Sequence, residues 1–400
     1  GFGHRSFRTL VNNFDSGGSR SPDLACSMTV QTGTLARAMD LEQLRNQLSA
    51  IDQQILGLVA ERQRLSGEIG ALKQATGRPT RDFIREKEIL ERARNLAVGL
   101  GISPGLAEAL LSLLIRSSLA NQEQARVRAE GQGSGKPALV IGGSGKMGRW
   151  FTEFLHSQGF NVTVADPAGP VPGFRHVANW RETPDEFAVT VVSAPIALTG
   201  GILRDLGARK RSGLIFDISS LKSPFIADLK NLCSQGLHAT SVHPMFGPDT
   251  ELLSGRHVLF LDSGCSAATT DAIQLFASTM AARVRMDIEE HDRLIAYVLG
   301  LSHALNIAFF TALADSGETV PKLADISSTT FDAQLQIAGR VAEENPNMYF
   351  AIQAENPFGL AALEELQRAV NRIADIVRTG DEPGFLRLME QGRSYLARRL

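Results

Sequence analysis

One histidine of this chain stands where a histidine can act as a base. His243 lies in the stretch SVHPMFGPDT, between an apolar run typical of a strand and the turn-forming residues Gly247 and Pro248. An unperturbed imidazole titrates at about pH 6.5, so it can accept a proton at neutral pH. The alternative is a histidine that only ends a strand and caps a turn. Ser220 and Lys222, in DISSLKSP, follow another apolar run in the same way.

A glycine-rich stretch upstream predicts a dinucleotide site. In ALVIGGSGKMGRWF a short apolar run precedes a GxGxxG motif and a helical stretch, and a second apolar run ends in an acid 18 residues after the last glycine. The glycines let the backbone approach a pyrophosphate, the helix N-terminus offers free N–H groups, and the acid binds the ribose while repelling a 2′-phosphate. We therefore predict NAD; a glycine-rich turn without nucleotide is the alternative. The predicted cofactor-binding residues are Gly143, Gly145, Lys146, Met147, Gly148 and Asp166.

The residues after this motif alternate between apolar runs and helical stretches. This alternation predicts a doubly wound α/β Rossmann sheet over residues 138–288, and the signal is helical from 289 to 400. Open sheets of this class bind ligands at the C-terminal ends of their strands. His243 and Ser220 both follow predicted strand ends, so we expect both at the ligand-binding edge.

Residues 39–128 carry the periodicity of three helices, at about 39–74, 80–98 and 104–128, which the breakers TGRP and GISPG separate. At 1.5 Å per residue the first helix is about 50 Å long. A helix of that length cannot bury its apolar stripe within one small unit. We therefore expect it to pair with a second copy of the chain.

Polar residues on these helices recur at spacings that place them on shared faces. Arg45 is turned about 100° from Arg62 around the first helix, so it cannot easily serve the same pocket from the same helix. Ordinary surface salt bridges are the alternative for any single pair. The residues that share faces are Arg62 with Lys73, Asp82 with Arg85 and Glu86, and Ser118 with Gln122.

The stretches LRNQLSAIDQQILGLVAERQRLSGEIGALK, RPTRDFIREKEILER and LLIRSSLANQ resemble the all-helical chorismate mutases, over residues 39 to about 126. The resemblance implies an all-α domain that converts chorismate to prephenate, in an interlocked homodimer where Arg45 enters the partner's site. Catalysis there requires only that charged side chains hold a reactive conformer and stabilise developing charge. The implied catalytic residues are Lys73 and Gln122, and the implied substrate-binding residues are Arg45, Arg62, Asp82, Arg85, Glu86 and Ser118.

The stretches VIGGSGKMGRWF, SAPI, DISSLK and HPMFGPD are similar to the prephenate dehydrogenase family, over residues 137 to about 390. Together the two halves resemble the bifunctional enzymes of tyrosine biosynthesis, because the first makes the prephenate that the second consumes. The resemblance implies an all-α dimerisation domain at the C-terminus and tyrosine as a feedback ligand. It also implies catalytic roles for His243, Ser220, Lys222 and His303, and substrate binding by Arg340. Asp332 departs from the family pattern, which has an arginine at this position.

One further histidine, His291, lies twelve residues before His303. On one continuous α-helix this spacing separates the two by about 120°, so we do not expect them to face one site together. A packed core histidine is the alternative role for either residue.

Composition limits the remaining possibilities. The net charge of −2 provides no basic field for nucleic acid. The three cysteines lack CxxC spacing, which indicates neither a disulfide framework nor a metal site and suits a reducing cytoplasm. No uninterrupted apolar run reaches the ~20 residues of a membrane span, and we expect the richest stretch, 294–313, to be a buried helix.

Residues 1–38 have the composition of a transit peptide, and a disordered leader or upstream extension is the alternative we favour. Residues 129–137 form a Gly-Ser linker. Two other functions remain open. One is an arogenate dehydrogenase whose mutase half serves mainly as a dimer clamp, and the other is a mutase whose Rossmann half only senses NAD.

Overall fold

The computed structural model of the chain describes residues 40–398. The predicted leader at residues 1–38 lies outside them. The chain divides into two units, 1–59 and 60–400, and the boundary falls inside the first helix, α1 (Leu41–Ala75).

The N-terminal segment is helical, as its periodicity predicts. The second helix, α2 (Phe83–Gly99), begins after Asp82, whose carboxylate accepts a hydrogen bond from the backbone N–H of Arg85 at 3.0 Å. The third helix, α3 (Pro104–Ala129), begins after Ser103, which caps it in the same way. These caps satisfy N–H groups that have no partner inside the helix, which explains where each helix starts.

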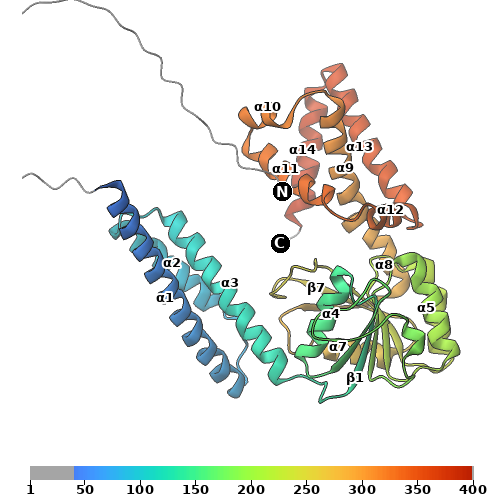
Figure 1. Ribbon diagram of the computed structural model, residues 1–400. Coiled ribbons are helices and arrows are strands. Elements are labelled where there is room, and N and C mark those ends of the chain that lie inside the picture. Colours follow the sequence, from blue (N-terminus) through green and yellow to red (C-terminus); the bar gives the residue numbers. More distant parts are fainter. Residues whose placement is uncertain (1–39, 399–400) are drawn as a thin grey trace, which may run out of the picture. The chain divides into compact units, whose positions relative to one another are not determined.

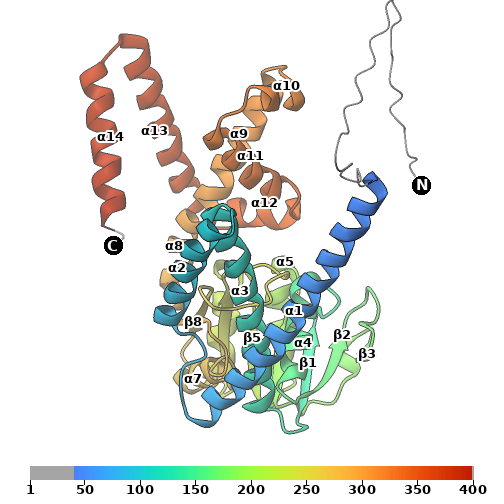
Figure 2. The same cartoon turned by 90° about the vertical axis from the view of Figure 1, so that its left-hand side faces the viewer.

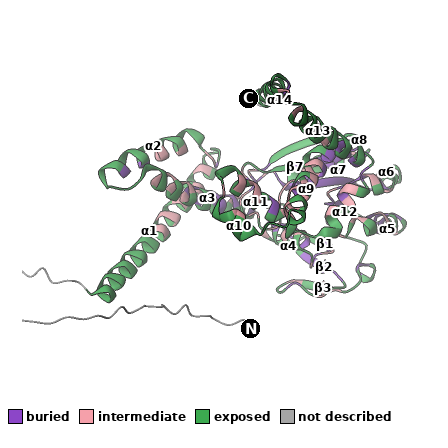
Figure 3. Cartoon of the chain, turned by 90° about the horizontal axis from the view of Figure 1, so that it is seen from above, coloured by how far each residue is buried: buried purple, intermediate pink, exposed green. Residues whose placement is uncertain are grey.

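The apolar stripe of α1 is exposed in the single chain. None of its residues is buried, and Figure 3 shows the helix in the colour of exposed residues along most of its length. A stripe of this length needs a covering surface. The nine residues of this stripe, each at least 45% exposed, are Leu41, Leu44, Leu48, Ile51, Ile55, Leu58, Leu65, Ile69 and Leu72.

An eight-stranded sheet follows, in the order β3-β2-β1-β4-β5-β6-β7-β8. Neighbouring strands are parallel except β6 and β7, which pair antiparallel. The sequence did not predict the edge strand β3, because a strand of three residues is too short to show periodicity. It also did not predict the antiparallel pair of β6 and β7, because an apolar run does not encode the direction of a strand relative to its neighbour. The strands are β1 (Pro137–Ile141), β2 (Asn161–Ala165), β3 (Arg175–Val177), β4 (Val189–Val192), β5 (Leu214–Asp217), β6 (Ala239–Pro244), β7 (His257–Asp262) and β8 (Ala282–Asp287).

Helices cover both faces of this sheet (Figure 1). On one face α4 and α7 pack around a core that includes Phe151 and Ala272, and on the other α5 and α6 pack through Leu203 and Leu229. The central strands are therefore buried on both sides, which explains why they read as continuous apolar runs. These helices are α4 (Lys146–Ser157), α5 (Ile196–Ala208), α6 (Ile226–Ser234) and α7 (Ser266–Leu275), with short 3-10 turns η1 (Trp180–Glu182) and η2 (Ser223–Phe225).

The rest of the chain is helical. Figure 2 shows α13 and α14 as neighbouring helices near the C-terminus. A π-helical segment, η3 (Ala296–Leu301), joins α8 to α9, so the helix that carries His291 is not one regular α-helix. The helices are α8 (Ile288–Ile295), α9 (Ser302–Asp315), α10 (Val320–Asp325), α11 (Thr329–Ala342), α12 (Pro346–Ala354), α13 (Gly359–Thr379) and α14 (Glu382–Ala397).

The expected burial of residues 294–313 is wrong for the single chain. Leu294, Val298 and Leu305 are 39%, 55% and 49% exposed. The continuous stretch Ile288–Asp315 is long and apolar enough to span a membrane by length and composition, and 22% of its most apolar window is buried. One copy of the chain supplies too few neighbours to cover it, because α11 and α13 pack along only part of its surface.

Candidate active sites

The glycine-rich loop joins β1 to α4, as the motif predicts. A Cβ on Gly148 would lie 2.1 Å from the carbonyl oxygen of Gly142, so only glycine lets α4 approach the loop this closely. A Cβ on Gly143 would lie 2.8 Å from a methyl group of Val164. No side chain caps α4, so the N–H groups of its first turn, from Lys146 onwards, are available to an anion.

The sequence interpretation missed one glycine of this loop. Gly142 has a φ of +82°, in the left-handed region that glycine adopts at little cost. A Cβ there would also lie 2.3 Å from the carbonyl oxygen of Ser193, at the end of the neighbouring strand β4. The signal was present as a pair of adjacent glycines, but the GxGxxG pattern uses only the second.

Asp166 directly follows β2 and is buried. Its carboxylate accepts hydrogen bonds from the backbone N–H groups of Ser144 at 3.0 Å and Ala168 at 2.8 Å. One oxygen therefore holds the glycine loop, and the remaining lone pairs can accept from ribose hydroxyls. Free N–H groups, close-approach glycines and this carboxylate together fit a dinucleotide such as NAD.

His243 lies near the end of β6 and is 3% exposed. Burial lowers the pKa of its imidazole well below 6.5, and the nearby His291 and Lys222 lower it further. The sequence suggested an unperturbed value, and the difference arises because β6 lies inside the sheet between β5 and β7. The imidazole is therefore neutral at physiological pH, which is the form that a base requires.

Lys222, in the loop after β5, is completely buried. Its Nζ lies 2.7 Å from Oδ2 of Asp217 and 3.1 Å from the carbonyl oxygen of Val242. Burial lowers the pKa of Lys222, and the attraction of Asp217 opposes that shift. The lysine thus joins the end of β5 to the residue that precedes His243.

A second histidine, His291 of α8, contacts the first. Its Nε2 lies 2.8 Å from Nδ1 of His243, and its Nδ1 lies 2.6 Å from Oδ1 of Asp292. Both residues are buried. The sequence placed neither His291 nor Asp292 in the site, because a contact between residues 48 positions apart leaves no local pattern. The α-helical angle between His291 and His303 also does not apply across η3.

The other predicted dehydrogenase residues lie on three elements. Ser220 is half-buried in the loop after β5, and Arg340 is exposed on α11. The ring of His303, on α9, contacts that of Tyr349 in a tilted arrangement with 4.1 Å between the ring centroids, and partial burial lowers the pKa of His303 to about 4. Asp332 accepts a hydrogen bond from a neighbouring serine at the start of α11. Among residues 40–398, no hydrogen bond or ion pair joins any of these side chains to His243.

Three predicted mutase residues lie together between the C-terminal half of α1 and α3. Nη1 of Arg62 donates to Oγ of Ser118 at 2.7 Å. Nε2 of Gln122 donates to Oγ of Ser66 at 2.7 Å. The two helices approach closely here, as the position of Gly70 shows: a Cβ on this residue would lie 2.8 Å from Cγ of Gln122.

The remaining mutase residues form other contacts. Nζ of Lys73 donates to the carbonyl oxygen of Thr80 at 2.7 Å. Glu86 accepts two hydrogen bonds from Arg81. The side chain of Arg85 pairs with Glu88, and Arg85 contacts Asp82 only through its backbone N–H. Arg45 belongs to the unit before Ala60 and is exposed.

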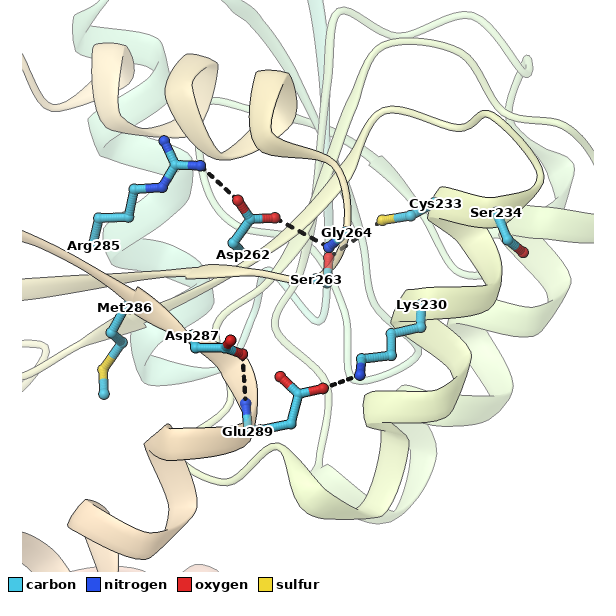
Figure 4. Close-up of a pocket in the computed structure, with 10 residues that line it drawn as sticks. All are labelled: Lys230, Cys233, Ser234, Asp262, Ser263, Gly264, Arg285, Met286, Asp287 and Glu289. Atoms are coloured by element: carbon cyan, nitrogen blue, oxygen red, sulfur yellow. Dashed lines mark hydrogen bonds and ion pairs between the residues drawn. The ribbon is translucent and has the colours of Figure 1, made fainter.

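A pocket of about 730 Å³ lies at the ends of β7 and β8 (Figure 4). Four of its five charged side chains form ion pairs, Arg285 with Asp262 and Lys230 with Glu289. Because β7 runs antiparallel to β6, the end of β7 lies at the edge of the sheet opposite His243. The pocket is thus separate from the dinucleotide edge. Within residues 40–398 no group of three acidic, histidine or cysteine side chains is arranged to hold a metal ion.

Comparison with known proteins places three parts of the chain. Residues 44–123 match the model for chorismate mutase type II, residues 174–282 that for the nucleotide-binding domain of prephenate dehydrogenase, and residues 287–391 that for its dimerization domain. The glycine-rich loop lies before the second match, so its assignment rests on the geometry above.

Two relatives align with this chain over most of their own length. The chain is 25% identical over 354 residues to the T-protein of Enterobacter agglomerans. This alignment covers 87% of this chain and 90% of the relative. It is 32% identical over 269 residues to the 4-amino-4-deoxyprephenate dehydrogenase of Streptomyces pristinaespiralis. This alignment covers 64% of this chain and 90% of the relative. Among solved structures, prephenate dehydrogenase from A. aeolicus in complex with hydroxyphenyl propionate and NAD+ has a TM-score of 0.51 at 19% identity, over 66% of this chain and 98% of that one, which shows the same fold.

Proposed function

The chain belongs to the prephenate dehydrogenase family and carries a type II chorismate mutase domain ahead of it, and from this premise we propose how its two sites work. The first domain rearranges chorismate to prephenate. The remainder oxidises prephenate with NAD to 4-hydroxyphenylpyruvate, in tyrosine biosynthesis. The observation that carries the second step is the burial of His243 at the C-terminal edge of the sheet, which lowers the pKa of its imidazole and favours the neutral form.

In the mutase site the chemistry needs position and charge but no nucleophile. Arg62 and an arginine from a second copy, Arg45, clamp the two carboxylates of chorismate bidentately. Lys73 and Gln122 donate to the ether oxygen as its bond breaks, where a positioned donor stabilises the developing charge. Glu86 orders the substrate hydroxyl, for which it exchanges its present hydrogen bonds with Arg81.

In the dehydrogenase site His243 removes the proton of the 4-hydroxyl of prephenate. Bound NAD would supply the acceptor for the hydride that leaves C4 while CO₂ departs and the ring becomes aromatic. The phenolate that results takes the proton back from the imidazolium of His243, which gives the hydroxyl of 4-hydroxyphenylpyruvate. Ser220, in the loop beside the end of β6, holds the same hydroxyl. Arg340 anchors the ring carboxylate as a charge-assisted partner. Because Arg340 is exposed on α11, closure of the helical domain over the sheet or a second copy of the chain must bring it to the substrate.

A second copy of this chain covers the exposed apolar surfaces. The stripe of α1 and the apolar side of α8–α9 lie open in the single chain, and α13 exposes Leu360, Val370 and Val377 by more than half. Surfaces of this extent in a soluble protein mark interfaces. The homodimer also supplies Arg45 to the partner's mutase site. We place the enzyme in the cytoplasm. Its feedback ligand is tyrosine, and Asp332 alters either the response to tyrosine or the affinity for substrate.

One experiment separates the candidate functions. Purified protein receives chorismate and NAD, and prephenate and NADH are followed together. A bifunctional enzyme forms prephenate first and NADH after a lag. Prephenate without NADH means that the second half only senses the cofactor. If chorismate yields no prephenate, arogenate and prephenate are each supplied with NAD in its place. NADH formed faster from arogenate than from prephenate then means an arogenate dehydrogenase with a mutase half that serves as a clamp.

The role of His243 and the shared mutase site are tested by variants. His243→Asn keeps a donor but cannot accept the proton, so kcat of the dehydrogenase falls by about 10²–10⁴ and mutase activity stays. A kcat within threefold of wild type removes His243 from the mechanism. For the dimer, Arg45→Ala and Glu86→Ala proteins are mixed and allowed to exchange subunits. Recovery of mutase activity supports a site shared between copies, and no recovery after proven exchange contradicts it.

A further inference from the structure

The hydrogen bonds around His243 decide which of its two ring nitrogens acts as the base. Asp292 receives hydrogen bonds from the backbone N–H groups of Lys222 at 3.1 Å and Ser223 at 2.6 Å. Burial raises the pKa of Asp292, but the hydrogen bonds from His291 and Ser223 outweigh burial and leave the pKa lowered. The group is therefore a carboxylate at neutral pH, and a carboxylate only accepts hydrogen bonds.

This carboxylate sets the tautomer of the adjacent histidine. Nδ1 of His291 lies 2.6 Å from Oδ1 of Asp292, so Nδ1 must carry the hydrogen. Burial lowers the pKa of His291, and the cation of Lys222 lowers it further, against the opposing effects of Asp292 and Asp217. His291 is therefore neutral, and its Nε2 has a lone pair.

The same reasoning carries to the base. Nδ1 of His243 lies 2.8 Å from Nε2 of His291. Because Nε2 of the neutral His291 has a lone pair and no hydrogen, Nδ1 of His243 must be the donor. A neutral imidazole with hydrogen on Nδ1 has its lone pair on Nε2. If His291 were cationic, it would donate to Nδ1 of His243 instead, Nε2 would carry the hydrogen, and the base would be blocked.

We propose, on the premise that His243 is the base of the dehydrogenase, that His291 and Asp292 are positioning residues that hold it as the Nδ1–H tautomer and present Nε2 to the substrate. The proton of the 4-hydroxyl moves to Nε2, while Nδ1 keeps its hydrogen and its bond to His291. The imidazolium that forms is stabilised through His291 by the carboxylate of Asp292. Asp292 also fixes the loop of Ser220, because it binds the N–H groups of Lys222 and Ser223.

The arrangement is the positioning of a histidine by a carboxylate, with one more imidazole inserted between them. In serine proteases, replacing the carboxylate by its amide leaves the geometry intact but selects the wrong tautomer, at a cost of about 10⁴ in kcat. The inserted imidazole lets a carboxylate on α8 act on a base in the sheet. Asn356, which donates to the carbonyl oxygen of Asp292 at 2.9 Å, holds this turn of α8 in place.

The decisive comparison is between two variants of His291 in the full chain. In His291→Gln the side-chain oxygen takes the place of Nε2 and still accepts from Nδ1 of His243, so kcat on supplied prephenate stays within about tenfold of wild type. In His291→Phe the ring fills the space but accepts nothing, so kcat falls by about 10² or more while the KM for prephenate changes little. A histidine that merely packs in the core predicts the reverse order, because phenylalanine fills a buried site better than glutamine.

Asp292→Asn tests the next link. Its amide N–H can face Nδ1 of His291, which reverses both tautomers and lowers kcat by about 10²–10⁴. The matched control is His238→Gln. His238 directly precedes the start of β6, and its Nε2 lies 2.8 Å from Oδ2 of Asp271. The substitution removes this histidine–aspartate pair and should leave kcat unchanged. Mutase activity and the thermal melting curve of each variant show that the chain is folded.

The outcomes separate this proposal from the premise. If His243→Asn keeps full activity, the premise fails. If His243→Asn is inactive while Asp292→Asn and both His291 variants match wild type, only the positioning role fails. Should His291→Phe not fold, the ¹⁵N spectrum of histidine-labelled wild-type protein decides: the signal lost in His243→Asn must show a protonated Nδ1 and a bare Nε2 at pH 7.5. The opposite tautomer overturns the proposal.

Discussion

Replacing Lys222 by methionine should destabilise the nucleotide-binding domain severely. Lys222→Met keeps the length of the side chain and removes its charge, which leaves the carboxylate of Asp217 fully buried without a cation. The N–H of Ser219, at 2.9 Å from Oδ2, is its one remaining hydrogen-bond donor among the described residues, and Oδ1 has none. Removing one partner of a buried ion pair costs about 3–5 kcal/mol, because the other charge stays desolvated and unpaired.

This magnitude is large compared with the stability of a typical domain, about 5–15 kcal/mol. With an m-value of about 2 kcal/mol per molar urea, the denaturation midpoint should fall by roughly 1.5–2.5 M. Tryptophan fluorescence reports on this domain directly, because both tryptophans, Trp150 and Trp180, lie in it. The double variant Lys222→Met/Asp217→Leu removes both charges and should recover most of the loss.

A matched control separates burial from charge. Arg94→Gln breaks the exposed pair of Arg94 with Glu108 in the helical domain and should leave the midpoint unchanged. A midpoint for Lys222→Met equal to that of the control would refute the reasoning. If the midpoint held while the KM for prephenate rose, Lys222 would be a substrate-binding residue and not the link between β5 and β6.

Three further outcomes are expected. Lys73→Ala should lower mutase activity by about 10²–10³ while dehydrogenase activity on supplied prephenate survives, and an equal loss of both would mean a shared site or a misfolded chain. Gly148→Ala should raise the KM for NAD sharply and spare the mutase, because its Cβ would meet the carbonyl oxygen of Gly142 at 2.1 Å; an unchanged KM would show that the loop moves freely. The free energy of unfolding should decrease as the pH falls from about 6.5 to 4, because the unfolded chain binds the proton that half-buried His303, with a pKa of about 4, excludes. His303→Gln should flatten part of this slope in urea titrations at several pH values, and a slope as steep as that of wild type would contradict the assignment.

The elements that carry chemistry could largely be predicted from the sequence, because each has a local signature. The GxGxxG spacing with a following acid predicted the β1–α4 loop and Asp166, and three runs of helical periodicity predicted α1 to α3. His243 could be placed at a strand end from the turn-forming residues Gly247 and Pro248 after it. These patterns are local because backbone geometry imposes them within a few residues.

What the sequence could not supply were contacts between distant positions and the solvation they produce. The bond from His243 to His291, the π-helical segment between α8 and α9, and the burial of Lys222 against Asp217 all depend on how strands and helices pack. The same packing lowers the pKa of His243 well below the value of a free histidine. A protonation state depends on the desolvation and charges that surround a group in three dimensions, so the sequence identified the candidate base, and only the tertiary structure decided that it is neutral and which nitrogen it presents.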